Sequence, residues 1–289
     1  MTTTVVTKYP SRSAVACHRA KSTVDVWLLL SIPVAVLMTI AAGIGLFVRG
    51  LYRDAPFFAL QAVAQDFITL FVVVPTLGVS VWWTARGSSR ARLVWLGALA
   101  YIVYSYAISV FVVRFNSLFL VYVGLFGCAL YALIGGVVTT DMKGIAERFT
   151  GRVPVRSVSA FLTLLAVLFY AVWLSEAVPA MLRGTVPPSV QQNGTPTNAV
   201  HVLDMAWMLP AFIIAAVNLA RRTPLGYTLA GAALTFVVLL VLAVLSIVGF
   251  AVRAGHPVVV PQVAIFGASF VGGLVLLVWY LKTLQTTFR

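Results

Sequence analysis

The chain contains seven acidic residues, and three of them, Asp66, Glu176 and Asp204, lie within long apolar stretches. An ionised side chain in the hydrocarbon of a bilayer costs about 2.5–3.5 kcal/mol on insertion scales unless it is paired or hydrated. Carboxylates kept in such a setting are typical of sites that bind a cation, carry a proton or coordinate a metal. These three acids are therefore the first candidates for chemistry.

Polar residues accompany two of these acids. His201 lies three residues before Asp204. Gln61 and Gln65 lie four residues apart, next to Asp66. Spacings of three and four place side chains on one helical face. The side chains predicted to bind a ligand or an ion are Asp66, Asp204, Gln65, Gln61, Glu176 and His201. No catalytic residue is predicted.

Each acid also has a purely structural interpretation. Asp204 can accept a hydrogen bond from His201 or from a neighbouring tyrosine and so hold its helix to the others. Glu176 lies shallow enough to be hydrated or to meet Arg183, two turns along the same face. The functional and structural interpretations predict different responses to substitution with asparagine.

The composition shows which solvent surrounds these residues. Hydrophobic residues make up 61% of the 289 residues and charged residues only 9%, whereas a soluble domain carries about 25% charged residues. Such a chain cannot cover a water-exposed surface, so most of its surface must face lipid. Two cysteines and three histidines, scattered along the chain, indicate neither a disulfide framework nor a histidine-rich metal centre. No cofactor is expected.

Long apolar runs predict the fold. A bilayer core about 30 Å thick is crossed by roughly 20 apolar residues in a helix. Eight runs reach that length, and none alternates polar and apolar residues as a β-barrel strand does. The sequence therefore predicts an all-α integral membrane protein with eight transmembrane helices. The runs are 26–48, 58–83, 93–113, 118–138, 158–180, 198–220, 227–252 and 261–281.

The placement of lysine and arginine predicts the orientation. Of these 20 residues, 15 fall in the two termini and in the connections between helices 2 and 3, 4 and 5, and 6 and 7. The remaining 5 fall in the other connections. Both termini are therefore predicted to be cytoplasmic, in a multi-pass protein of the plasma membrane. The net charge of +13 reflects this topology, and nucleic-acid binding is not expected.

Matches between the two halves predict an internal duplication. Pro75 matches Pro210 at an offset of 135, and Gly97 matches Gly231 at 134. Apolar helices also align by chance, but a near-constant offset favours two parallel four-helix repeats, as occur in transporters. The predicted segments are a basic N-terminal segment 1–24, a first unit 25–140, a linker 141–157, a second unit 158–283 and a tail 284–289.

The three acids share one half of the membrane, the half predicted to be external. The cytoplasmic halves of the helices hold no acidic residue. Asp66 and Asp204, at an offset of 138, each precede a mid-helix proline that permits a bend. The sequence therefore predicts a polar cleft that opens to the outside and is closed below by apolar packing.

Three functions fit this pattern. The first is a transporter or permease that binds a cation or small solute in the outward cleft, with Asp66 and Asp204 at the repeat interface. The second is an intramembrane enzyme with a metal site built from His201, Asp204, Asp66 and Glu176. The third is a non-catalytic membrane subunit or ligand sensor. The absence of an HExxH motif and of a nucleophile motif makes an enzyme the less favoured alternative.

The partners expected are the lipid bilayer and a small-molecule or cation ligand from the external side. Connections are short, so protein partners would dock through helices. Gly135-Gly136 and Gly272-Gly273 would permit the close helix approach that a helix-mediated oligomer needs.

Cysteine-accessibility labelling tests the orientation. A cysteine introduced at position 190 should react with an impermeant reagent added outside, because the 181–197 connection is predicted to be external. A cysteine at position 88 should react only from inside. Labelling of position 190 from inside, or of position 88 from outside, would overturn the predicted topology.

Overall fold

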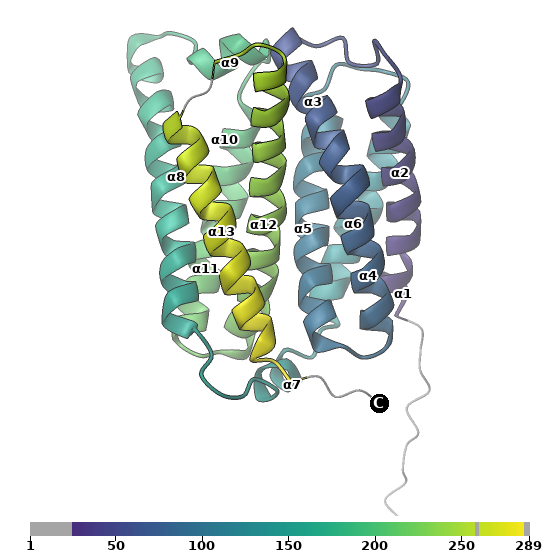
Figure 1. Cartoon of the computed structure of the whole chain (residues 1–289), viewed down its shortest axis with the longest axis vertical. Coiled ribbons are helices and arrows are strands. Elements are labelled where there is room, and N and C mark those ends of the chain that lie inside the picture. Colours follow the sequence, from purple (N-terminus) through teal and green to yellow (C-terminus); the bar gives the residue numbers. More distant parts are fainter. Residues whose placement is uncertain (1–24, 258–259, 286–289) are drawn as a thin grey trace, which may run out of the picture.

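The computed structural model describes residues 25–257 and 260–285 of the chain. Within these residues, eight helical segments are long and apolar enough to cross a membrane, and they lie alongside one another (Figure 1). The prediction of an all-α membrane protein with eight transmembrane helices is confirmed. The spans are Val26–Phe47, Pro56–Ala85, Ser89–Phe111, Phe119–Val138, Val155–Arg183, Ala199–Ala220, Pro224–Arg253 and Val260–Lys282.

Three spans consist of more than one helical element. The first contains α1 and α2, the second contains α3, the π-helix η1 and α4, and the sixth contains α10, the π-helix η2 and α11. The short helices α7 and α9 lie in connections. The bounds are α1 Val26–Leu29, α2 Ser31–Phe47, α3 Pro56–Ile68, η1 Thr69–Val73, α4 Val74–Ala85, α5 Ser89–Phe111, α6 Phe119–Val138, α7 Met142–Glu147, α8 Val155–Arg183, α9 Pro188–Asn193, α10 Ala199–Leu203, η2 Asp204–Met208, α11 Leu209–Ala220, α12 Pro224–Arg253 and α13 Val260–Lys282.

Local capping extends two spans beyond the apolar runs that predict them. Helix α12 starts at Pro224, three residues before the run 227–252, because the Thr223 side chain accepts a hydrogen bond from the backbone N–H of Gly226. Helix α8 continues to Arg183, where Gly184 adopts the left-handed conformation that ends a helix (φ 64°). Hydropathy locates a span, and capping residues set where it begins and ends.

The loops define two ends of the bundle, which we name after the short helices in them (Figure 1). The α7 end comprises the loops 86–88, 139–154 and 221–223 and the residues that follow α13. The α9 end comprises the loops 48–55, 112–118, 184–198 and 254–257.

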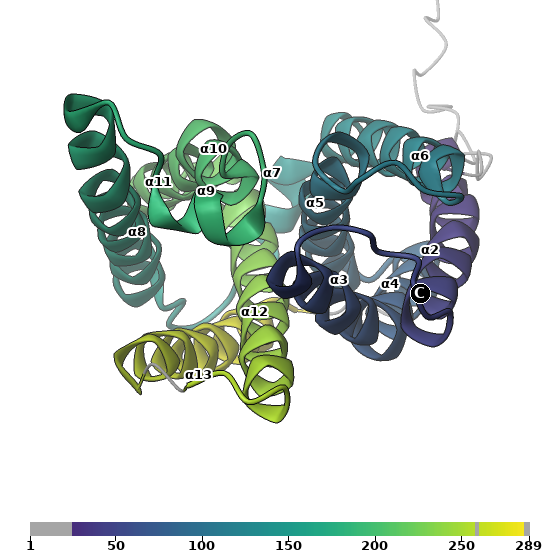
Figure 2. The ribbon, with the colours of Figure 1, turned by 90° about the horizontal axis from the view of Figure 1, so that it is seen from above.

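The spans form two groups of four with the same order of contacts (Figure 2). In the first unit, α2 packs on α3, α4 and α6, and α5 packs on α4 and α6. In the second unit, α8 packs on α11 and α13, and α12 packs on α11 and α13. Each unit is thus a ring of four spans in sequence order.

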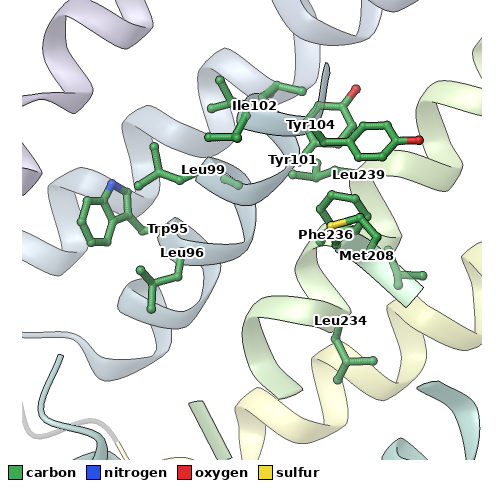
Figure 3. Close-up of a cluster of buried hydrophobic side chains, with 14 of the residues drawn as sticks. Trp95, Leu96, Leu99, Tyr101, Ile102, Tyr104, Met208, Leu234, Phe236 and Leu239 are labelled. Atoms are coloured by element: carbon green, nitrogen blue, oxygen red, sulfur yellow. The ribbon is translucent and has the colours of Figure 1, made fainter. Parts of the chain in front are cut away.

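The third and seventh spans, α5 and α12, form the centre of the interface between the units. Helix α12 also packs along α3, whereas α10 meets α5 over only a few residues. Figure 3 shows Phe236 of α12 beside Tyr101 and Tyr104 of α5, with ring centroids 6.3 Å and 5.6 Å apart.

Two glycines allow α5 and α12 to approach closely. A Cβ on Gly97 would overlap the carbonyl oxygen of Ala232 and would lie 2.5 Å from the Cβ of Thr235. A Cβ on Gly231 would lie 2.7 Å from a methyl carbon of Leu93. Each helix therefore places its glycine against the other helix, the arrangement that small residues permit in membranes.

A π-helix precedes the proline in both the second and the sixth span. The N–H of Val74 bonds the carbonyl of Thr69, five residues back, and Pro75 follows. The N–H of Leu209 bonds the carbonyl of Asp204 in the same way, and Pro210 follows. A proline cannot donate a backbone hydrogen bond and clashes with the preceding turn. The wider π-turn accommodates the proline. The sequence predicts a simple bend at this point instead.

The substitution Gly97→Ala tests the close approach of α5 and α12. The added methyl group meets backbone and a β-branched side chain, so we expect a loss of about 1–3 kcal/mol and a lower unfolding temperature in detergent. Gly127→Ala on α6 is the matched control, because no heavy atom lies within 4 Å of the position that its methyl group would take. Equal unfolding temperatures for the two variants would contradict the packing described.

Candidate functional site

Asp66 lies on α3 in the half of the first unit nearer the α9 end, with 7% of its surface exposed. Tyr52, in the loop 48–55, donates a hydrogen bond of 2.5 Å to its Oδ2. Burial, followed by the neighbouring carboxylate, raises the pKa of Tyr52 far above its usual range. Its hydroxyl therefore stays protonated and acts as the donor. The phenol of Tyr52 faces this carboxylate. Within the described residues, no cationic side chain pairs with it.

Asp66 also lies directly against the backbone of α2. A Cβ on Gly45 would overlap Oδ2 of Asp66, at a separation closer than two nonbonded atoms can approach. Because glycine has no side chain, position 45 leaves room for the carboxylate. Gly43, on the same helix, has nothing within 4 Å of the corresponding position.

Further hydroxyl groups surround Asp66. The hydroxyl of Tyr122, on α6, lies 3.5 Å from that of Tyr52. The ring of Tyr106, on α5, lies 6.1 Å from the ring of Tyr122. Three phenols from a loop and two helices therefore gather around one carboxylate.

The two predicted glutamines contact different parts of the protein. Gln65 donates hydrogen bonds to Tyr101 and, at 3.3 Å, to Ser105, both on α5. Gln61 donates a hydrogen bond of 3.0 Å to Asn193 at the end of α9. This second contact joins α3 of the first unit to the connection between α8 and α10 of the second.

Asp204 is the first residue of η2 and is as buried as Asp66. The Tyr104 hydroxyl donates to its Oδ1, and the indole N–H of Trp173 donates to its Oδ2, both at 2.9 Å. Tyr104 belongs to α5 and Trp173 to α8, so Asp204 joins the two units through one carboxylate.

His201 and Glu176 lie beside this second carboxylate. The His201 ring lies 4.2 Å from the Trp173 ring, and its Nε2 is 3.7 Å from Oε2 of Glu176. The other Glu176 oxygen accepts a hydrogen bond of 2.7 Å from the backbone N–H of Ser189. Glu176 therefore holds the first turn of α9 across the α9 end of the second unit.

Four of the six predicted residues belong to two networks, whereas Gln61 and Gln65 bond other partners. One surrounds Asp66, and the other joins Asp204, His201 and Glu176 through Trp173. Across residues 25–257 and 260–285, the hydrogen bonds of Asp66 and Asp204 share no partner. In the same residues, no three His, Cys, Asp or Glu side chains are close enough to hold a metal ion. The structure therefore does not bring together the four residues of the predicted metal site.

The two π-helices allow the positions of Asp66 and Asp204 in their spans to be compared. Thr69 and Asp204 each begin a π-helix, an offset of 135 that also relates the two prolines. At this offset Asp66 corresponds to His201, so the two acids lie about one helical turn apart in their spans. Asp66 faces the interior of the first unit, whereas Asp204 faces the interface.

A polar cavity of about 220 Å³ lies at the α7 end. Arg92, in its wall, pairs with Asp25 at 2.8 Å and donates to the hydroxyls of Thr139 and Thr140. These bonds brace the ends of α1, α5 and α6 against one another.

An apolar cavity of about 170 Å³ lies between the units. Its walls include Leu96 and Ala100 of α5, Met208 of η2, Phe212 of α11 and Phe236 of α12. Because Met208 and Asp204 belong to the same π-helix, this hydrocarbon-lined space lies near the second network.

Several residues of the networks are not marked by the sequence pattern. Tyr52 lies in a short loop. Trp173 lies on an apolar helix, where Ser175 is the one polar residue between it and Glu176. Gly45 is one of two glycines in its span. Their residue types alone could have indicated Tyr52 and Trp173, because a buried Tyr or Trp usually has a hydrogen-bond partner.

Comparisons with family models, curated proteins and solved structures found no match to the chain. The fold and the two networks define its class: a polytopic α-helical membrane protein with two separate buried carboxylates in the half of the bundle nearer the α9 end.

The pair Gly45→Ala and Gly43→Ala tests the position of Asp66. The methyl group at position 45 must displace the carboxylate, so we expect a loss of about 1–3 kcal/mol and a lower unfolding temperature than for Gly43→Ala. In a double-mutant cycle, the loss should shrink when Asp66 is also replaced by alanine. Additive losses would contradict the contact.

Proposed function

We propose that the protein is a permease in which Asp66 and Asp204 bind protons or a cation from the side of the α9 end. The observation that carries this proposal is the buried carboxylate in each unit that lies at or just before a π-helix and its proline. Intramembrane carboxylates are costly and mark proton and ion pathways. π-Helices are likewise frequent at functional sites.

The proposal includes an internal duplication of a four-helix unit. It is supported by the common contact order of the two rings and by the reciprocal contacts of Gly97 and Gly231. It is also supported by the helices that follow η1 and η2, since α4 and α11 each contain 12 residues. An even number of spans per unit makes the repeats parallel, related by an axis along the membrane normal.

The proposed orientation places the α7 end in the cytoplasm of a cell bounded by this membrane, because that end carries most of the arginine and lysine residues. In this structure, α9 crosses the opposite end and contacts both units through Asn193 and Ser189. We take this arrangement as a state closed toward the α9 end. Opening the predicted cleft would require release of the Gln61–Asn193 contact.

Relative movement of the units would also change the surroundings of Asp204. Its bond to Tyr104 crosses the interface, whereas its bond to Trp173 stays within the second unit. Protonation would remove the negative charge that both donors meet and so weaken the bond across the interface. Proton binding and unit movement are thereby coupled at one residue.

A ligand sensor that receives a lipid or small apolar molecule is a second candidate. The apolar cavity between the units favours it, because its walls are hydrocarbon and aromatic and lie between α5 and α12. The permease remains the better supported function, since the sensor gives no role to Asp66.

Proton flux into liposomes tests the function. We expect the purified protein to dissipate an imposed pH gradient, reported by an entrapped pH-sensitive dye. Asp66→Asn and Asp204→Asn should each abolish this flux with little change in unfolding temperature, because asparagine keeps the shape and loses the charge. Glu147→Gln, which removes an exposed carboxylate at the α7 end, is the control and should retain the flux.

Two outcomes would contradict the permease. One is a wild-type flux no greater than that of protein-free vesicles. The other is equal flux in the wild type and both asparagine variants. If the second is accompanied by a lower unfolding temperature for the Asp→Leu variants, the carboxylates are structural, because leucine leaves their buried donors unsatisfied.

A further inference from the structure

Three polar atoms on residues close to Tyr122 are buried and have no hydrogen-bonding partner in the described chain. They are Oδ2 of Asp54, the hydroxyl of Tyr106 and Nδ2 of Asn116. Leaving a buried polar atom unpaired is destabilising, so such atoms in native proteins are usually bonded to ordered water. All three belong to the first unit, on its side nearer the α9 end.

These atoms extend from the α9 end toward Asp66. Asp54 and Asn116 lie in the loops 48–55 and 112–118. Both side chains are close to the Tyr122 hydroxyl, on which Asp54 acts through its charge and Asn116 through its side-chain amide. Tyr122 in turn lies 3.5 Å from Tyr52, which bonds Asp66.

Tyr106 lies to one side of this series. It is 5% exposed, and both Asp66 and Tyr122 act on it electrostatically. Polar side chains therefore extend from the loops to the carboxylate, and the unpaired Tyr106 hydroxyl belongs to a residue close to them.

The chemistry of the unpaired atoms favours water over a bare metal cation. The amide nitrogen of Asn116 can only donate, and the carboxylate oxygen of Asp54 can only accept. Water both donates and accepts, and a buried water typically makes about three hydrogen bonds. A cation could bind the oxygen of Asp54 but would leave the amide group unsatisfied.

We propose that internal water molecules connect Asp54, Asn116, Tyr106 and Tyr122 into a proton path from the α9 end to Asp66. This inference rests on the proposed proton binding at Asp66. A proton passed from water to the oxygen of Tyr52 is matched by transfer of the phenol's own proton to Oδ2 of Asp66. The phenol ends neutral, and the carboxylate ends protonated.

The second unit has no corresponding path within the residues that the structure describes. Both oxygens of Asp204 meet donors, and the indole N–H of Trp173 cannot accept a proton. The other buried unpaired side-chain atoms in the described residues, on Thr84 and Ser159, lie toward the α7 end. Within the described residues, the proposed path thus leads to Asp66 and not to Asp204.

Radiolytic hydroxyl-radical labelling in detergent tests for the water directly, without depending on transport. Because radicals form from water next to a side chain, Tyr106 and Tyr122 should be oxidised despite their burial. Tyr104 is the control, since it is similarly buried and bonds Asp204. Labelling of Tyr106 and Tyr122 no faster than that of Tyr104 would overturn the path.

Proton flux in liposomes gives the second readout. Tyr106→Phe and Tyr122→Phe should each slow the flux about tenfold, the equivalent of about 1.4 kcal/mol in a barrier. Tyr131→Phe, on α6 with 62% of its surface exposed, should leave it unchanged. If Asp66→Asn abolishes flux while both Phe variants keep the wild-type rate, the path is wrong and the role of Asp66 stands. If Asp66→Asn has no effect, the proposed function fails as well.

Discussion

The arrangement of the molecule depends on the close packing of α5 against α12. In a bilayer, apolar surface gains nothing by leaving lipid for protein, so helices associate through van der Waals contact and interhelical hydrogen bonds. Gly97 and Gly231 bring the two backbones together, and the tyrosines of α5 then lie within reach of both units. Tyr101 accepts a hydrogen bond from Gln65 of the first unit, and Tyr104 donates one to Asp204 of the second. One helix–helix contact thus positions polar partners for side chains of both units.

The donors that meet these carboxylates in the described structure are neutral. A phenol faces Asp66, and a phenol and an indole face Asp204. Aromatic side chains suit this task because each combines a large apolar body with one polar group. A buried cation would itself need solvation in hydrocarbon. Its pairing with the acid would also lower the affinity of the carboxylate for a proton. At the α7 end, by contrast, a cationic group is used for bracing, where Arg92 holds three helices together.

Much of the fold and part of the site could be predicted from sequence, for identifiable physical reasons. A lipid-facing helix needs about 20 apolar residues, which fixes the number of spans, and an ionisable residue inside such a run is rare enough to mark Asp66, Glu176 and Asp204. Their partners could not be predicted, since Tyr52 and Trp173 reach them only through tertiary packing. Pro75 and Pro210 indicated a disturbance of the helix, but the π-turn that absorbs it depends on backbone geometry that proline alone does not specify.

The π-helices also change the phase of the side-chain pattern along the second and sixth spans. A residue advances about 100° around an α-helix, and a π-turn holds one residue more than an α-turn, so the stripe facing the interior shifts by one position on crossing η1 or η2. A residue four places beyond an inward-facing neighbour consequently lies on a different side when the π-turn separates them. The two halves of each span can therefore follow separate constraints: a buried carboxylate with its donors at or before the π-helix, and mainly apolar residues from there toward the α7 end.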